Sequence, residues 1–164
     1  MILGMTTFVF VHVVLSLIEI LTGLIVMFGL LGGKRVDGWT ASFLLTTVAT
    51  SVTGFLLPAH HFMPSHGVGI VSMVVLVLAI LARYTFHLAS GWRRTYVVSA
   101  MIALYLNVFV LIAQAFQKVP SLKAMAPTGS EPPFLVAQVV CMVIFIALTI
   151  GAAIKFRNEM VGTA

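Results

Sequence analysis

The chain has 164 residues, of which 61% are hydrophobic and only 8% are charged, and its mean hydropathy is +1.17. Soluble domains carry about 25% charged residues, so this composition excludes an ordinary water-soluble domain. The formal net charge of +5 does not indicate nucleic-acid binding, because the basic residues gather at the ends of apolar runs, where lipid head groups lie.

Five apolar runs fill almost the whole chain, and each is long enough to cross about 30 Å of hydrocarbon as a helix rising about 1.5 Å per residue. The runs cover residues 6–31, 39–57, 67–90, 95–117 and 134–154. The sequence therefore predicts an all-α fold, in which a bundle of five transmembrane helices forms one integral membrane domain over residues 1–164. No room is left for a separate soluble domain.

Most basic residues fall on one side of such a bundle. Six of them follow the first, third and fifth runs: Lys34, Arg35, Arg93, Arg94, Lys155 and Arg157. The other side has only Lys118 and Lys123. Because cytoplasmic segments carry an excess of Lys and Arg, we expect the N-terminus outside and the C-terminus in the cytoplasm. The expected location is the inner, or plasma, membrane.

The first run carries a glutamate, Glu19, near its centre. His12, Ser16 and Glu19 are spaced i, i+4 and i+7, so they share one face of a helix. A carboxyl group at mid-membrane is costly, and it marks a functional site by default. We therefore interpret Glu19 as a proton-active group that is either protonated or paired with a donor such as Asn107 or His12.

The second run is rich in hydroxyl side chains. One stripe of them contains Ser42, Thr46, Thr50 and Thr53, with Thr47, Ser51 and Gly54 beside it. Thr46 or Thr50 falls at a depth similar to that of Glu19, so both are candidates for lining a ligand site. The alternative interpretation is that these hydroxyls bond to carbonyls of their own helix, four residues earlier, or hold helices together.

The fourth run carries two amides, Asn107 and Gln114, spaced i, i+7 on one face. Asn107 falls at the depth of Glu19, and Gln114 falls in the outer third with His12. We interpret the two amides as groups that orient Glu19; the alternative is a purely structural role in helix packing.

Histidines gather at the outer edge of the predicted bundle. His60, His61 and His66 lie in the loop between the second and third runs, and His12 lies just below that edge. Three or four imidazoles in a small volume can bind zinc, copper or haem iron. Their spacing matches no strict metal-binding motif, and the alternative is an ordinary solvated loop.

At the cytoplasmic end of the third run, Arg83 and His87 are spaced i, i+4. Such a pair anchors a helix or binds lipid when the arginine extends to the interface. The functional alternative is a clamp for a carboxylate of a cofactor, such as a haem propionate, or for an anionic substrate.

The sequence contains no Gly-rich phosphate loop, nucleophile elbow, CxxC or HExxH motif, so it does not support water-soluble chemistry. The leading hypothesis is a membrane protein that binds a small cofactor or ligand, most specifically haem or a metal ion. The ligand would lie in a polar seam between the first, second and fourth helices. The alternatives are a proton-coupled transporter or channel for small solutes, and an accessory subunit of a larger membrane complex. We expect contacts with membrane lipids and with a second copy or other subunits.

Overall fold

The computed structural model describes residues 6–57 and 64–161, and that part of the chain is all-helical, without strands. Its elements are α1 (Thr7–Leu31), α2 (Asp37–Phe55), α3 (Pro64–Ile80), a π-helical turn η1 (Leu81–Thr85), α4 (Trp92–Lys118), α5 (Pro120–Met125) and α6 (Pro132–Val161). The predicted all-α fold class is confirmed.

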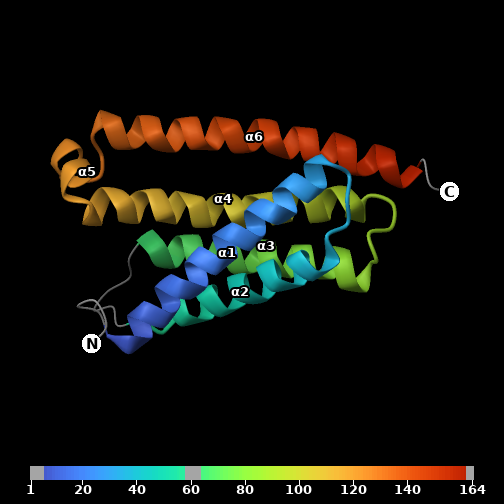
Figure 1. Ribbon diagram of the computed structural model, residues 1–164, viewed down its shortest axis with the longest axis horizontal. Helices are drawn as coiled ribbons and strands as arrows, with labels where there is room; N and C mark the ends of the chain where they lie inside the picture. Colours follow the sequence, from blue (N-terminus) through green and yellow to red (C-terminus); the bar gives the residue numbers. More distant parts are fainter. Residues whose placement is uncertain (1–5, 58–63, 162–164) are drawn as a thin grey trace.

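The long helices run back and forth along the longest axis of the molecule, so that α1 begins at one end and α6 finishes at the other (Figure 1). α1 crosses the bundle diagonally, and it contacts α2, α4 and α6. α3 packs between α2 and α4, and α6 lies outermost against α4 and α1. This order gives the molecule two chemically different ends.

The basic end contains the α1–α2 connection, the segment after η1 and the last turns of α6. Its basic side chains are those of Lys34, Arg35, Arg83, Arg93, Arg94 and Lys155. The opposite end contains the start of α1, the end of α4 and the short helix α5, with Lys118 and Lys123. The asymmetry that the sequence predicted is therefore present in three dimensions.

Four helical segments are long and apolar enough to cross a membrane: Thr7–Leu31, Gly67–Thr85, Trp92–Lys118 and Pro132–Phe156. They make the chain a multi-pass membrane protein by length and composition. α2 is not one of the four, because its 19 residues include five threonines and two serines, which lower its hydropathy. The prediction of a fifth span therefore remains open at α2.

The third helix ends earlier than predicted, at Thr85 and not at Ser90. After Ile80 the backbone widens into the π-turn, in which the amide of Phe86 donates to the carbonyl of Leu81 at 2.9 Å. His87, Leu88 and Ser90 then adopt positive φ angles of 47°, 59° and 47°. Leu88 is only 1% exposed, so burial of its side chain accompanies the reversal that ends the helix.

α1, α2 and α4 approach one another closely at Gly23. A Cβ atom at this position would lie 2.6 Å from Cδ1 of Leu104 on α4 and 2.9 Å from Cε2 of Phe43 on α2. Only a residue without a side chain fits there without movement of its neighbours. This tight contact lies one helical turn beyond Glu19 and fixes the three helices around it.

Candidate functional site

The carboxyl group of Glu19 is enclosed by the helix bundle. Glu19 is 0% exposed, and neither of its carboxyl oxygens has a hydrogen-bond partner within the described part of the chain. Burying an unpaired carboxylate costs several kcal/mol or more, so such a group becomes protonated instead. A protonated carboxyl group in this position can donate one hydrogen bond and accept others.

Two hydroxyl groups of α2, on Thr47 and Thr50, lie beside the carboxyl of Glu19, although neither reaches hydrogen-bond geometry with it. Thr47 donates to the carbonyl of Phe43 at 2.7 Å. Thr50 is buried, and its hydroxyl has no partner among the described residues. Thr50 is therefore the hydroxyl left available for Glu19. We call Glu19, Thr47 and Thr50 the carboxyl site.

The structure separates the two threonines that the sequence singled out. Thr46 is half-buried, and its hydroxyl donates to backbone carbonyls of its own helix, at 2.8 Å to Ser42 and 3.1 Å to Phe43. The second hydroxyl beside Glu19 is that of Thr47, which the sequence placed only next to the stripe. One residue is a step of about 100° around a helix, and sequence alone does not give the absolute orientation of the helix.

The two amides of α4 are half-buried. The side-chain amide of Asn107 donates to the carbonyl of Ala103 at 3.0 Å, and no hydrogen bond between described residues joins it to Glu19. The contact between Gly23 and Leu104 places the next turn of α4, with Asn107, at about the level of Glu19. The orienting roles of Asn107 and Gln114 stay predictions.

His12 lies on α1, about two helical turns before Glu19, toward the end of the molecule opposite the basic end. Its Nδ1 atom lies 2.8 Å from the hydroxyl of Thr53, and Thr53 donates its own proton to the carbonyl of Ala49 at 2.8 Å. Since a hydroxyl has only one proton, Thr53 accepts from His12, and Nδ1 carries the hydrogen. Nε2 of His12 is then the ring nitrogen with a free lone pair.

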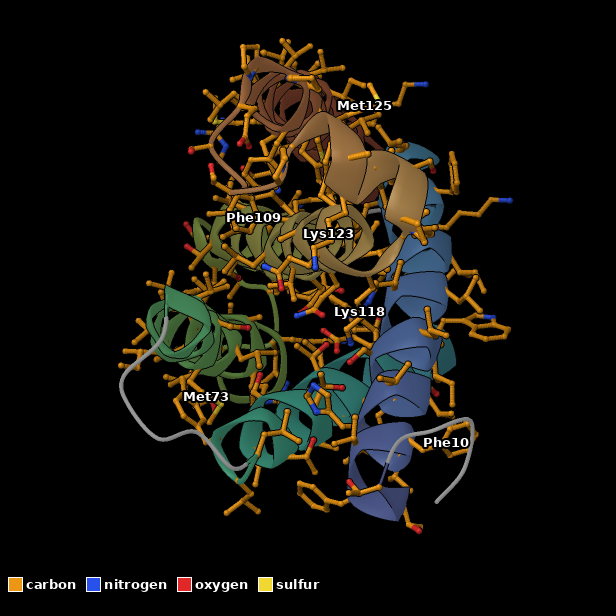
Figure 2. The ribbon with its side chains drawn as sticks, turned by 90° about the vertical axis from the view of Figure 1, so that its left-hand side faces the viewer. Phe10, Met73, Phe109, Lys118, Lys123 and Met125 are labelled. Atoms are coloured by element: carbon orange, nitrogen blue, oxygen red, sulfur yellow. The ribbon has the colours of Figure 1, made fainter. Side chains whose placement is uncertain are left out.

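Lys118, at the end of α4, lies close enough for its charge to act on the ring of His12. Figure 2 looks along the helices from this end and shows Lys118 beside α1. His12 and Thr53 therefore form a half-buried polar contact between α1 and α2, near the positive charge of Lys118. We call these two residues the outer pair.

The structure describes only some of the proposed metal ligands. His60 and His61, and the side chain of His66, lie outside the described residues. Among the residues that are described, no group of three or more His, Cys, Asp or Glu side chains converges. The prediction of a haem or metal site on the outer histidines is thus neither confirmed nor contradicted.

A second polar site lies at the basic end, around Arg83. The side chain of Arg83 is only 4% exposed and forms an ion pair with Asp37, the first residue of α2. Its guanidinium carbon also lies 5.1 Å from the ring centroid of Tyr96 and 5.8 Å from that of Tyr84, distances typical of cation–π contacts. Sequence reasoning missed Asp37 and Tyr96, since nothing local links them to Arg83.

A cavity of about 400 Å³ opens beside this ion pair. It is lined by Arg35, Asp37, Gly38, Ala41, Arg83, Tyr84 and His87. His87 does not share a helical face with Arg83, because the helix has already ended. The chain reversal nevertheless brings both residues to the same cavity, although not in the way that their i, i+4 spacing predicted.

Comparisons of the chain with protein-family models, with curated proteins and with solved structures find no match.

Proposed function

We propose that this chain is an inner-membrane protein whose working group is the carboxyl of Glu19. In this proposal Glu19 takes up and releases a proton as a small ligand or cofactor enters the polar seam between α1 and α2. The observation that carries the proposal is the complete burial of a carboxyl that has no hydrogen-bond partner among residues 6–57 and 64–161, beside a hydroxyl that also has none there. A bundle built only for stability would place a leucine there, because an unsatisfied buried polar group costs free energy.

In this proposal a proton reaches Glu19 from the side of the outer pair. His12 and Thr53 lie on the same two helices as the carboxyl site, and Glu19 follows His12 by seven residues, or about 10 Å of helix. An imidazole can both accept and donate a proton. Because Nδ1 of His12 donates to Thr53, Nε2 carries the lone pair that could accept a proton and pass it on.

The proposed topology has five spans, with α2 crossing the membrane beside α1. Three of its hydroxyls, on Thr46, Thr47 and Thr53, donate to carbonyls of α2 itself, which reduces the cost of placing them in hydrocarbon. Its 19 residues span about 28 Å. The basic end would face the cytoplasm, and α1 would begin outside.

Reporter fusions test the topology. A reporter in the loop around Gly129 should be external, and one after the C-terminus should be cytoplasmic. A third reporter, placed before α1, separates the models: with the C-terminus in the cytoplasm, five spans put it outside, and four spans put it in the cytoplasm. Finding the Gly129 and C-terminal reporters on the same side would refute both the proposed orientation and the crossing by α6.

Infrared difference spectroscopy of the carboxyl stretch across pH tests the proposed proton exchange. The wild-type chain should show one protonated carboxyl band that disappears in Glu19→Gln, a change that keeps shape and removes the titratable group. The band should gain or lose intensity between about pH 5 and 9 if Glu19 exchanges protons near neutrality. A Glu19 band that stays constant over that range would make the residue a fixed hydrogen-bond donor.

The nature of the ligand is tested separately. An optical spectrum and metal analysis of the gently extracted protein address haem and metal ions, with His12→Gln as the matched variant. Proton-coupled flux in liposomes addresses the transport alternative, with Glu19→Gln as the control. A colourless, metal-free wild-type protein that moves protons with a solute would favour transport over cofactor binding.

A further inference from the structure

We propose that Arg35, Arg83 and Asp37 form an anion clamp at the basic end, and that the clamp takes the phosphate group of an anionic molecule. The clamp shares no residue with the carboxyl site. It consists of a cavity, the buried side chain of Arg83 and the oxygen of Asp37 that both guanidinium groups approach.

Both arginines converge on one oxygen atom. Nη2 of Arg83 donates to Oδ1 of Asp37, and Nε of Arg35 lies 3.8 Å from the same Oδ1. Two guanidinium groups around a single anionic oxygen are the arrangement with which proteins bind phosphate. In this structure the carboxylate oxygen of Asp37 stands in for a phosphate oxygen.

The two partners of the ion pair differ in solvent exposure. Arg83 has a side chain that is 4% exposed, whereas that of Asp37 is 67% exposed. The guanidinium of Arg83 lies near the rings of Tyr84 and Tyr96, and these contacts and its burial restrict its movement. Asp37, on a short and exposed side chain, can turn toward water when a stronger anion arrives.

The cavity is larger than the carboxylate of Asp37 requires. Its volume of about 400 Å³ lies in the range of small-ligand sites, about 300–1,000 Å³. Besides the clamp it is lined by Tyr84 and His87, which can donate a hydroxyl and a ring N–H to further phosphate oxygens. With two arginines and one aspartate the lining carries a net charge of +1, which suits a phosphodiester.

The clamp lies at the end of a membrane-spanning segment. Arg83 lies in the last, π-helical turn of the span Gly67–Thr85, and π-turns often mark functional sites. Trp39 and Trp92 belong to the same end, and tryptophans prefer the membrane–water interface. A lipid phosphodiester and a free phosphate share the required chemistry, so the test includes one arm for each.

The experiment uses the full chain purified in a neutral detergent. One arm adds phosphatidylglycerol or phosphatidylcholine and measures retained lipid by native mass spectrometry; the other adds inorganic phosphate and measures its ³¹P line width. Arg35→Gln is the test variant, since Arg35 is exposed enough for the change not to disturb folding. Arg94→Gln, an exposed basic residue outside the cavity lining, is the matched control.

Arg35→Gln should weaken binding about tenfold, the effect of one charge-assisted hydrogen bond. Arg94→Gln should weaken it by at most about twofold, as expected for a distant screened charge. Asp37→Asn should strengthen binding, because the competing carboxylate is removed. Selective binding of phosphatidylglycerol supports a lipid source, and binding of inorganic phosphate supports a soluble one. Equal losses in the two arginine variants, weaker binding in Asp37→Asn, or no binding in either arm would overturn the clamp.

Discussion

Replacing Glu19 by leucine should make the protein more stable while abolishing its proton exchange. Glu19 is completely buried, and both carboxyl oxygens are unpartnered in the described part of the chain. A buried polar group without its hydrogen bond costs about 1–3 kcal/mol. Leucine has a similar size and removes that cost. The substitution therefore tests whether the carboxyl of Glu19 lowers the free energy of unfolding of the wild-type protein.

The expected gain is smaller than the full cost. A change of side-chain shape in a packed site costs up to about 1.5 kcal/mol, and a membrane-embedded unfolded state also satisfies polar groups in part. We therefore expect Glu19→Leu to raise the free energy of unfolding by about 1 kcal/mol. For a chain of this size that corresponds to a rise of about 2–4 °C in the melting temperature.

Loss of helical circular dichroism on heating, or on titration with a denaturing detergent, measures the change. Thr47→Val is the matched control on the facing helix, because its hydroxyl is already bonded to the carbonyl of Phe43; we expect a change within about 0.5 kcal/mol. If Glu19→Leu instead lowers stability by more than about 1 kcal/mol, the carboxyl has a favourable partner in the native protein. The case for an unpartnered working acid would then be lost.

Three further predictions concern packing, strain and pH. Gly23→Ala should destabilise the bundle by about 1–3 kcal/mol through overpacking, whereas Gly67→Ala, with nothing within 4 Å of its added Cβ, should not; equal thermal shifts would refute the close contact. Ser90→Gly should raise the melting temperature slightly, because the φ of 47° disfavours residues with a Cβ, and a drop would contradict the left-handed conformation. Desolvation alone would raise the pKa of Glu131, but hydrogen bonds from the amide and hydroxyl of Thr128 and from the loop amides lower it from 4.5 to about 2. This lowered pKa stabilises the loop above about pH 4.5, and the stabilisation should be lost as the pH falls through 2. The protection of the Thr128 amide, measured relative to its intrinsic exchange rate, should fall over that window in the wild type but not in Glu131→Gln.

The apolar runs predicted the helices well because a membrane helix needs only length and low polarity. The end of the third helix was not predictable in the same way. Residues 81–90 continue an apolar pattern, and the shift to π-helical bonding accompanies the burial of Leu88. That burial depends on neighbours from other helices, which a local pattern does not contain.

The neighbours of the polar residues were also not predictable from a local sequence pattern. Glu19 was recognisable from sequence, since a carboxyl in an apolar run is conspicuous wherever its neighbours lie. Its neighbours were not recognisable: Thr47 and Thr50 lie 28 and 31 positions further along the chain, and the choice between Thr46 and Thr47 depends on the rotation of α2. Asp37 is 46 positions from Arg83, and no periodicity connects the two.

Both polar sites include residues of α2, and this explains why α2 is not one of the four apolar spans. Asp37, at its first turn, enters the clamp, and Thr50, in its second half, faces Glu19. α2 packs against both α1 and α3, so neighbouring helices, and not lipid alone, surround its hydroxyls. A helix shielded in this way does not need the hydropathy of an isolated span. The low hydropathy that keeps α2 out of the four apolar spans is therefore the feature expected of a helix that contributes to two polar sites.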